Sequence, residues 1–215
     1  MTTLLDLVKT TNFAWFIGHL GTVISTVGYF GFAWKTYYQA LFLSCVSYGI
    51  TMLYPPIQAV NIDYLLLCIT CFMYDPFWPV LIPLAGYSVL HSCTYISNTI
   101  IAQVYPHMTQ IKAPLDNFVA NQDSVIRYVA IWEIVGMGSH LLIGLLMLKT
   151  SFFLFVGYVV FIRRKYQNSA LTRQSFSIIH LQMTKLFEKF PPALGFYLKF
   201  SNIMSQMAPV EAKNS

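Results

Sequence analysis

Few residues in this 215-residue chain have the type and spacing that catalysis or metal binding requires. Cys68 and Cys71 form a CxxC pair, but a zinc site needs two more ligands and the chain has no second pair. The sequence holds no nucleophile elbow, metal-binding helix motif or P-loop. We therefore predict a protein that is not an enzyme and that has no catalytic, cofactor or metal site.

Glu133 and His140 are the ionisable residues that invite a functional interpretation, because they lie inside an apolar segment. They are seven positions apart, so they share one helical face two turns apart. A proton or ion path needs a chain of such groups, and only His91 could extend this one. An ion or proton transporter, or a regulatory channel subunit, is the alternative function. The favoured interpretation is that Glu133 lies near the interface and bonds Arg127 or a neighbouring helix.

The composition indicates the class of protein to which these residues belong. Charged residues make up only 10% of the chain, whereas soluble domains carry roughly 25%. Hydrophobic residues reach 56%, and the mean hydropathy is +0.58. Twenty-one charged residues cannot cover the surface of a soluble globule of this size. The chain is predicted to be an all-α, polytopic integral membrane helical bundle with C-terminal amphipathic helices.

Three segments are long and apolar enough to cross a bilayer core of about 30 Å at about 1.5 Å per residue. Residues 12–34 and 80–104 are uncharged, and residues 128–148 contain only Glu133. A fourth span is predicted over residues 37–54, which end at Pro55-Pro56. Residues 152–162 are too short to cross alone, and we expect them to extend the last span into the interface.

Small residues follow one face of two predicted spans. Close approach of helices in lipid favours such faces. We expect them to pack the chain's own bundle, with a docking face for another membrane protein as the second interpretation. The predicted helix-packing residues are Ala14, Gly18, Gly21, Ser25, Gly28, Gly136, His140 and Gly144.

The C-terminal part is basic, since residues 149–215 hold nine basic and two acidic residues. We divide the chain into a transmembrane bundle, 1–162, and a cytoplasmic tail of amphipathic helices, 163–215, because basic flanks mark the cytoplasmic side. The tail lies on anionic lipid headgroups or caps the bundle. Nucleic acid is not expected, because the basic residues form no dense run with stacking aromatics. The predicted membrane-surface residues are Arg163, Arg164, Lys165, Arg173, Phe176, Ile179, Met183, Lys185, Phe187 and Lys189.

An ordered set of short motifs resembles the transmembrane protein 33 (Krüppel-homologue 2) family. The set covers most of the chain, from about residue 10 to residue 209, and no single motif is specific alone. It comprises PVLI at 79–82, LHSCTY at 90–95, NQ at 121–122, EI at 133–134, FIRRKY at 161–166 and SQMAP at 205–209, with DYLL at 63–66.

The resemblance implies a protein of the endoplasmic reticulum membrane and nuclear envelope, with pore-membrane nucleoporins among its yeast relatives. It implies non-enzymatic work, namely organising tubular reticulum and nuclear pore distribution. The implied partners are the lipid bilayer and membrane proteins of reticulon or nucleoporin type. It also links animal members to calcium-channel regulation and the unfolded-protein response.

Overall fold

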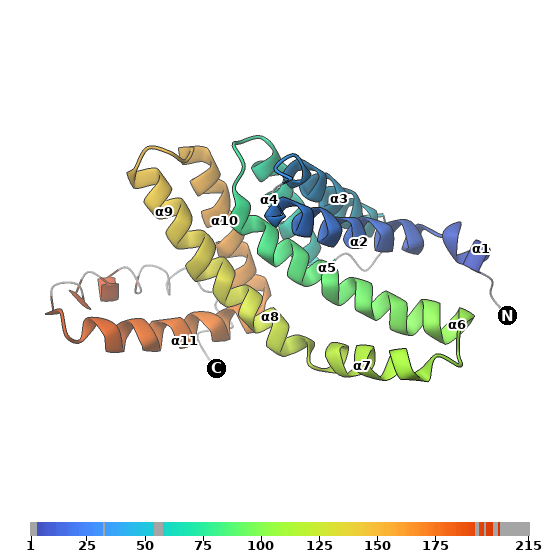
Figure 1. The fold of residues 1–215 in the computed structure, drawn as a ribbon. Helices are drawn as coiled ribbons and strands as arrows, with labels where there is room; N and C mark the ends of the chain where they lie inside the picture. The colour runs from blue at the N-terminus through green and yellow to red at the C-terminus, as the bar shows by residue number, and fades with distance from the viewer. Residues whose placement is uncertain are drawn as a thin grey trace.

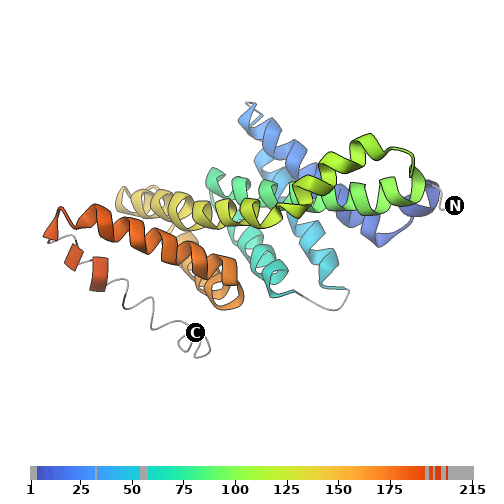
Figure 2. The same cartoon turned by 90° about the horizontal axis from the view of Figure 1, so that it is seen from below.

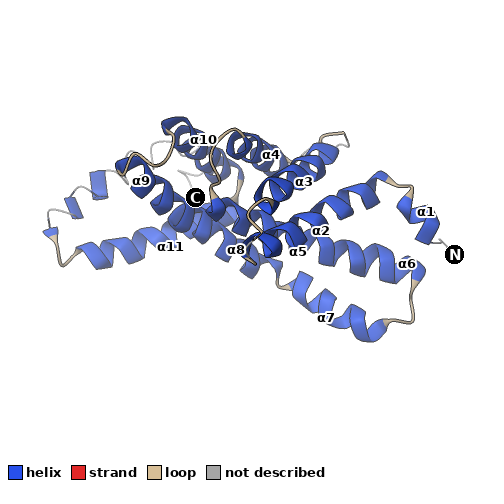
Figure 3. Ribbon diagram, turned by 45° about the horizontal axis from the view of Figure 1, so that its top comes forward, coloured by secondary structure: helices blue, strands red, loops and turns tan. Residues whose placement is uncertain are grey.

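The computed structural model describes residues 4–31, 33–53, 58–191, 194, 195, 197–199 and 202, which contain helices and turns but no strand (Figures 1 and 3). The predicted all-α fold is confirmed. The first half of the chain contains α1 (Leu4–Val8), α2 (Thr11–Phe30), α3 (Thr36–Thr51), α4 (Ala59–Phe72), the 3-10 turn η1 (Trp78–Val80), α5 (Leu81–Tyr95), the π-helical segment η2 (Ile96–Ile101) and α6 (Ala102–Val104). The second half contains α7 (Thr109–Ala120), α8 (Gln122–Ile131), the π-helical segment η3 (Trp132–Met137), α9 (Gly138–Leu146), α10 (Phe152–Asn168) and α11 (Ala170–Phe187).

Three of the described helices are long and apolar enough to cross a membrane: Thr11–Phe30, Trp78–Val104 and Gln122–Leu146. They coincide with the predicted spans 12–34, 80–104 and 128–148. Their outward side chains are apolar, as Ile24, Val27 and Leu146 show with 63%, 68% and 76% of their surface exposed. Such surfaces suit acyl chains. The protein is therefore a multi-pass membrane protein.

The remaining helices of the bundle are shorter. α3 has 16 residues, α4 has 14 and α10 has 17, so each is shorter than the bilayer core at about 1.5 Å per residue. The fourth predicted span, 37–54, coincides with α3, and its crossing stays a prediction. The Pro55-Pro56 boundary lies outside the described residues.

Successive helices of the bundle run antiparallel. Ser47 of α3 donates a hydrogen bond to the carbonyl of Trp15 near the start of α2. α4 pairs its Tyr64 with Tyr48 near the end of α3, and the two stacked rings lie 5.4 Å apart. α10 in turn runs opposite to α4, because its Arg164 meets Asp63 near the start of that helix.

α9 and α10 form a helical hairpin (Figure 1). The chain turns at Leu148, whose φ of 56° is left-handed, and the amides of Lys149 and Thr150 donate to the carbonyl of Gly144 at 2.8 and 3.2 Å. Residues 152–162 therefore return along the bundle, which corrects the expectation that they extend the preceding span. The predicted boundary between residues 162 and 163 falls inside α10.

α11 leaves the bundle after this hairpin and lies beside α8 (Figures 1 and 2). The bundle core that α10 joins is rich in tyrosine. Tyr37, Tyr48 and Tyr64 are at most 1% exposed and pack with Leu41 and Met137. Tyrosine hydroxyls in a core usually find partners. The hydroxyl of Tyr37 accepts from the amide of Phe77 at 3.0 Å, and that of Tyr64 belongs to the polar site described next.

Candidate functional site

Three helices bring Glu133, Lys165 and Tyr64 together in the bundle. The ammonium of Lys165, on α10, lies 2.5 Å from one carboxylate oxygen of Glu133. It also donates to the hydroxyl of Tyr64, on α4, at 2.9 Å. That hydroxyl donates to the second carboxylate oxygen of Glu133. The three side chains thus close a ring of charge-assisted hydrogen bonds, the strong class of such bonds.

This ion pair is fully enclosed. Glu133 and Tyr64 have no exposed surface, and Lys165 has 1%. The ammonium also lies over the ring of Tyr64, 4.8 Å from its centroid, and 5.3 Å from that of Tyr87. These aromatic faces stabilise the cation where water cannot. Removing one partner of such a pair costs about 3–5 kcal/mol, because the other charge stays buried.

Glu133 belongs to η3, a π-helical segment between α8 and α9. π-helical turns shift the ordinary helical hydrogen-bond pattern and need other partners. Tyr158 of α10 supplies one, since its hydroxyl lies 2.8 Å from the carbonyl oxygen of Glu133 and 3.2 Å from that of Ile134. A β-carbon on Gly138 would lie 2.7 Å from this hydroxyl, so glycine leaves room for the contact.

A second ion pair adjoins the first. Asp63, the residue before Tyr64, is 1% exposed and accepts from the Nε of Arg164 at 2.5 Å. The amide of Asn168 donates to its other oxygen at 3.5 Å. Arg164 keeps 40% of its side chain exposed, so this pair reaches the surface. Two consecutive residues of α4 therefore bond two consecutive residues of α10.

Lys165 does not lie at the membrane surface as predicted. Successive residues of a helix point about 100° apart, so the three basic residues of 163–165 take three directions. Arg163 is exposed, Arg164 bonds Asp63, and Lys165 enters the core. Glu133 bonds neighbouring helices, which was one of its two expected partners.

Glu133, His140 and His91, the three ionisable residues considered for an ion path, do not form a connected series. His140 is placed beside Phe77 and Trp78, with ring centroids 5.6 and 5.7 Å apart. His91 instead lies 4.7 Å from the ring of His19, on α2. The structure gives neither histidine a contact with Glu133, whose two bonded side chains are Tyr64 and Lys165.

The small-residue face of α2 packs inside the protein. A β-carbon on Gly18 would collide with Ser47 of α3, and one on Gly21 would lie 2.7 Å from Leu43. Gly28 lies against Thr36 at the start of α3. Ser25 is buried, but Ala14 is exposed. The structure thus places most of this face against α3.

The second small-residue face makes different contacts. A β-carbon on Gly136 would meet the ring of Trp132 one turn earlier in the same helix, and one on Gly144 would meet Thr150 after it. His140, between them, is exposed and contacts the segment before α5. His140 therefore contacts a different element, the segment before α5, through its ring. The two glycines instead allow close contacts with residues near them in the sequence, Trp132 and Thr150.

The tail helix α11 presents two apolar faces. The inner face continues from the buried Thr172 and Ser175 and includes the partly buried Phe176, Ile179, Met183 and Phe187. Its neighbour is α8. The exposed apolar residues are Ile178, Leu181 and Leu186, which are 37%, 58% and 60% exposed. At about 100° per residue, Ile178 and Leu181 lie on the outer face, whereas Leu186 lies beside the inner Ile179. Lys185 and Lys189 are also exposed.

Arg173 holds the corner between α10 and α11. Its guanidinium donates to the carbonyls of Tyr166 and Gln167 at 3.2 and 3.0 Å. Cations bond well to carbonyls at the C-terminal end of a helix. Ser169 caps the next helix by accepting from the amide of Thr172 at 3.2 Å. The carbonyls at the end of α10 and an amide at the start of α11 therefore both have side-chain partners at this corner.

Together these contacts position the tail rather than a reacting atom. The buried ring fixes α10 against α4 and η3, the second pair fixes its last turn, and Arg173 fixes α11 on α10. In the part of the chain that is described, no group of three His, Cys, Asp or Glu residues could hold a metal ion.

The roles of Lys165 and Tyr64 in this ring were not predicted from the sequence. One signal was available, because Lys149 is equidistant in sequence from Glu133 and Lys165. An apolar segment leads from Glu133 to Lys149, and another leads from Lys149 to Lys165. If the chain reverses at Lys149, the two opposite charges come together, which is the pattern of a helical hairpin closed by an ion pair. No comparable signal marks Tyr64, one of 14 tyrosines in the chain.

Comparison with known proteins matches residues 4–210 to the family model described as transmembrane protein 33/nucleoporin POM33. The chain is 26% identical to "Tetra-spanning protein 1" of Schizosaccharomyces pombe, over 88% of this chain and 81% of that protein. It is 24% identical to "Pore membrane protein of 33 kDa" of Saccharomyces cerevisiae, over 81% of this chain and 74% of that protein. No solved structure matches the chain. The resemblance found in the sequence is confirmed, and the chain belongs to the transmembrane protein 33/nucleoporin POM33 family.

Proposed function

We propose that this protein organises tubular endoplasmic-reticulum membrane and nuclear pore distribution, without enzymatic activity, by presenting a rigidly held amphipathic helix to the membrane surface. It would reside in the endoplasmic reticulum membrane and nuclear envelope, with the tail in the cytoplasm. The name of the Saccharomyces cerevisiae relative supports the nuclear-envelope part. Membrane proteins of reticulon or nucleoporin type are the proposed partners.

The observation that carries the proposal is the outer face of α11. Ile178 and Leu181 are exposed on the side of α11 that faces away from its partly buried residues, although the helix is already packed on α8. Apolar residues at helical spacing beside exposed lysines are typical of helices that lie in the headgroup region. Each Lys or Arg there gains about 1 kcal/mol against anionic lipid.

The anchoring network gives this helix a fixed direction. A flexible tail would bind lipid wherever its length allowed, whereas α11 is attached through Arg173 and the buried Lys165–Glu133 pair. Binding of a rigidly attached helix transmits the shape of the membrane surface to the bundle. This coupling is what a protein that organises curved membrane requires.

The first test replaces the outer apolar residues in the full-length protein, as Ile178→Glu with Leu181→Glu. The matched control is Gln174→Glu with Gln182→Glu, which adds the same charge at exposed polar positions of the same helix. We expect the first variant to lose rescue of tubule density and pore spacing in cells lacking the protein, and the control to rescue. Equal rescue by both variants would refute the role of the outer face.

The second test measures amide hydrogen exchange in nanodiscs. Amides of α11 are expected to exchange more slowly in anionic than in neutral lipid, because the lysines and the apolar face enter the headgroup region together. Lipid-independent exchange in α11 would contradict the proposal. Exchange in α4 provides the internal control, since this helix lies within the bundle.

A further inference from the structure

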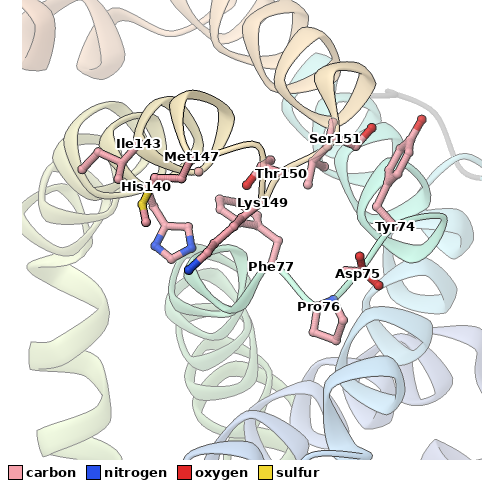
Figure 4. Close-up of a pocket in the computed structure, with 12 residues that line it drawn as sticks. Tyr74, Asp75, Pro76, Phe77, His140, Ile143, Met147, Lys149, Thr150 and Ser151 are labelled. Atoms are coloured by element: carbon pink, nitrogen blue, oxygen red, sulfur yellow. The ribbon is translucent and has the colours of Figure 1, made fainter.

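A cleft with a volume of about 290 Å³ lies between the α9–α10 turn and the segment that follows α4 (Figure 4). Its polar lining residues include Asp75, His140, Lys149, Thr150 and Ser151. Small-molecule sites usually measure about 300–1,000 Å³. At about 290 Å³ this cleft lies at the lower limit of that range, so it suits a compact polar group and is too small for a whole lipid.

The cleft carries opposite charges that do not neutralise each other. Lys149 and Asp75 both line it, yet the ion pairs among the described residues include neither of them. Figure 4 shows that Lys149 and His140 come from the α9–α10 part of the cleft, whereas Asp75 comes from the facing segment, next to Pro76. A cleft lined by both charges suits a ligand that carries both signs itself.

Apolar side chains continue the cleft toward the lipid. Ile143 and Met147 line it and are 55% and 56% exposed, and the neighbouring Leu146 is 76% exposed. They lie at the end of the membrane-spanning helix Gln122–Leu146, where the headgroups of one leaflet begin. A ligand in the cleft would thus have its polar part inside and its apolar part along this helix.

We propose that the cleft binds the headgroup of a phospholipid that bears a primary ammonium, of the phosphatidylethanolamine class. The phosphate faces Lys149 and His140, with the hydroxyl of Thr150 as a further donor. The ammonium faces the carboxylate of Asp75. The acyl chains leave along Ile143. This site lies away from α11 and is independent of the function proposed for the tail.

The charges select this headgroup over two common alternatives. Phosphatidylglycerol has the same phosphate but lacks the ammonium that Asp75 would bind. A choline group cannot donate hydrogen bonds to a carboxylate and is usually held by an aromatic cage instead. A primary ammonium has three donors, so it can use Asp75.

Native mass spectrometry of the full-length protein in detergent measures the dissociation constants of phosphatidylethanolamine, phosphatidylcholine and phosphatidylglycerol. The test variants are Lys149→Gln and Asp75→Asn. Lys9→Gln and Asp123→Asn are the controls, which remove the same charges from exposed positions elsewhere. Glycerophosphoethanolamine, the headgroup without acyl chains, tests whether a lipid or a free phosphoester is the ligand.

We expect the wild type to prefer phosphatidylethanolamine. Lys149→Gln should weaken phosphatidylethanolamine and phosphatidylglycerol by about tenfold each, whereas Asp75→Asn should weaken phosphatidylethanolamine alone. The controls should stay within about twofold. Unchanged binding in both test variants, an equal loss in the controls, or equally tight binding of glycerophosphoethanolamine would overturn the proposal.

Discussion

Replacing Lys165 by methionine tests the buried ion pair directly. Methionine replaces the apolar part of the lysine side chain but lacks the ammonium. It leaves the Glu133 carboxylate, which has no exposed surface, with Tyr64 as its remaining side-chain donor. An unpaired charge in such a site costs about 3–5 kcal/mol. A chain of this size changes its melting temperature by about 2–4 °C per kcal/mol. The expected loss is therefore about 6–20 °C.

The matched control is Arg163→Met, because Arg163 lies two positions earlier on the same helix and is exposed. Arg163→Met should change the free energy of unfolding by no more than about 0.5 kcal/mol. The measurement is thermal unfolding of the full-length protein in one detergent, followed by tryptophan fluorescence. If the melting temperature of Lys165→Met equals that of Arg163→Met, the ion pair does not hold the fold.

A double-mutant cycle separates the ion pair from the packing. Glu133→Gln removes the negative charge, so in the double variant with Lys165→Met no buried charge is left unpaired. We expect the double variant to be more stable than the sum of the two single losses predicts, because interacting residues are not additive. Additive losses would show that the two charges do not interact.

Three further predictions concern other contacts. Gly18→Ala should destabilise the fold by about 1–3 kcal/mol by overpacking, whereas Gly49→Ala should not, because a β-carbon at Gly49 meets nothing within 4 Å; thermal unfolding compares them. The pKa of Asp116 is lowered chiefly by the hydrogen bond from Lys112. The folded state therefore loses stability as the pH falls through that pKa. Lys112→Met should raise the pKa of Asp116, which a carboxyl NMR titration would measure. Arg173→Met should accelerate amide exchange at the α10–α11 corner and leave exchange in α2 unchanged.

The composition and the uncharged lengths were sufficient to predict the three long membrane helices. Hydrophobic segments of 20 or more residues have few alternatives to a spanning helix. The short helices were harder, because packing decides whether a segment such as α4 crosses, and packing involves residues distant in sequence. The small-residue face of α2 is visible in the sequence as a pattern, but the helix that its glycines meet, α3, is given only by the structure.

The return of α10 could not be predicted from turn residues. Helix reversals usually contain glycine or proline, but residues 145–156 contain neither, and Leu148 takes the left-handed conformation. Bonds from the amides of Lys149 and Thr150 to Gly144 hold this turn. When this turn is not known, Lys165 is simply a basic residue that follows an apolar segment, which is the pattern of a membrane-surface residue. The direction of one helix therefore determined the role of one lysine.

The order of antiparallel contacts has a consequence for both proposed sites. α10 runs opposite to α4, α4 opposite to α3, and α3 opposite to α2, so α10 ends on the side where α2 begins. The tail therefore follows from the side of the bundle where α2 begins, and the cleft at Lys149 lies at the other end of α10. If both sites bind lipid, they contact opposite leaflets. The helix between them, α10, is the one that the Lys165–Glu133 pair holds in place, so both proposed sites depend on the same helix being correctly packed.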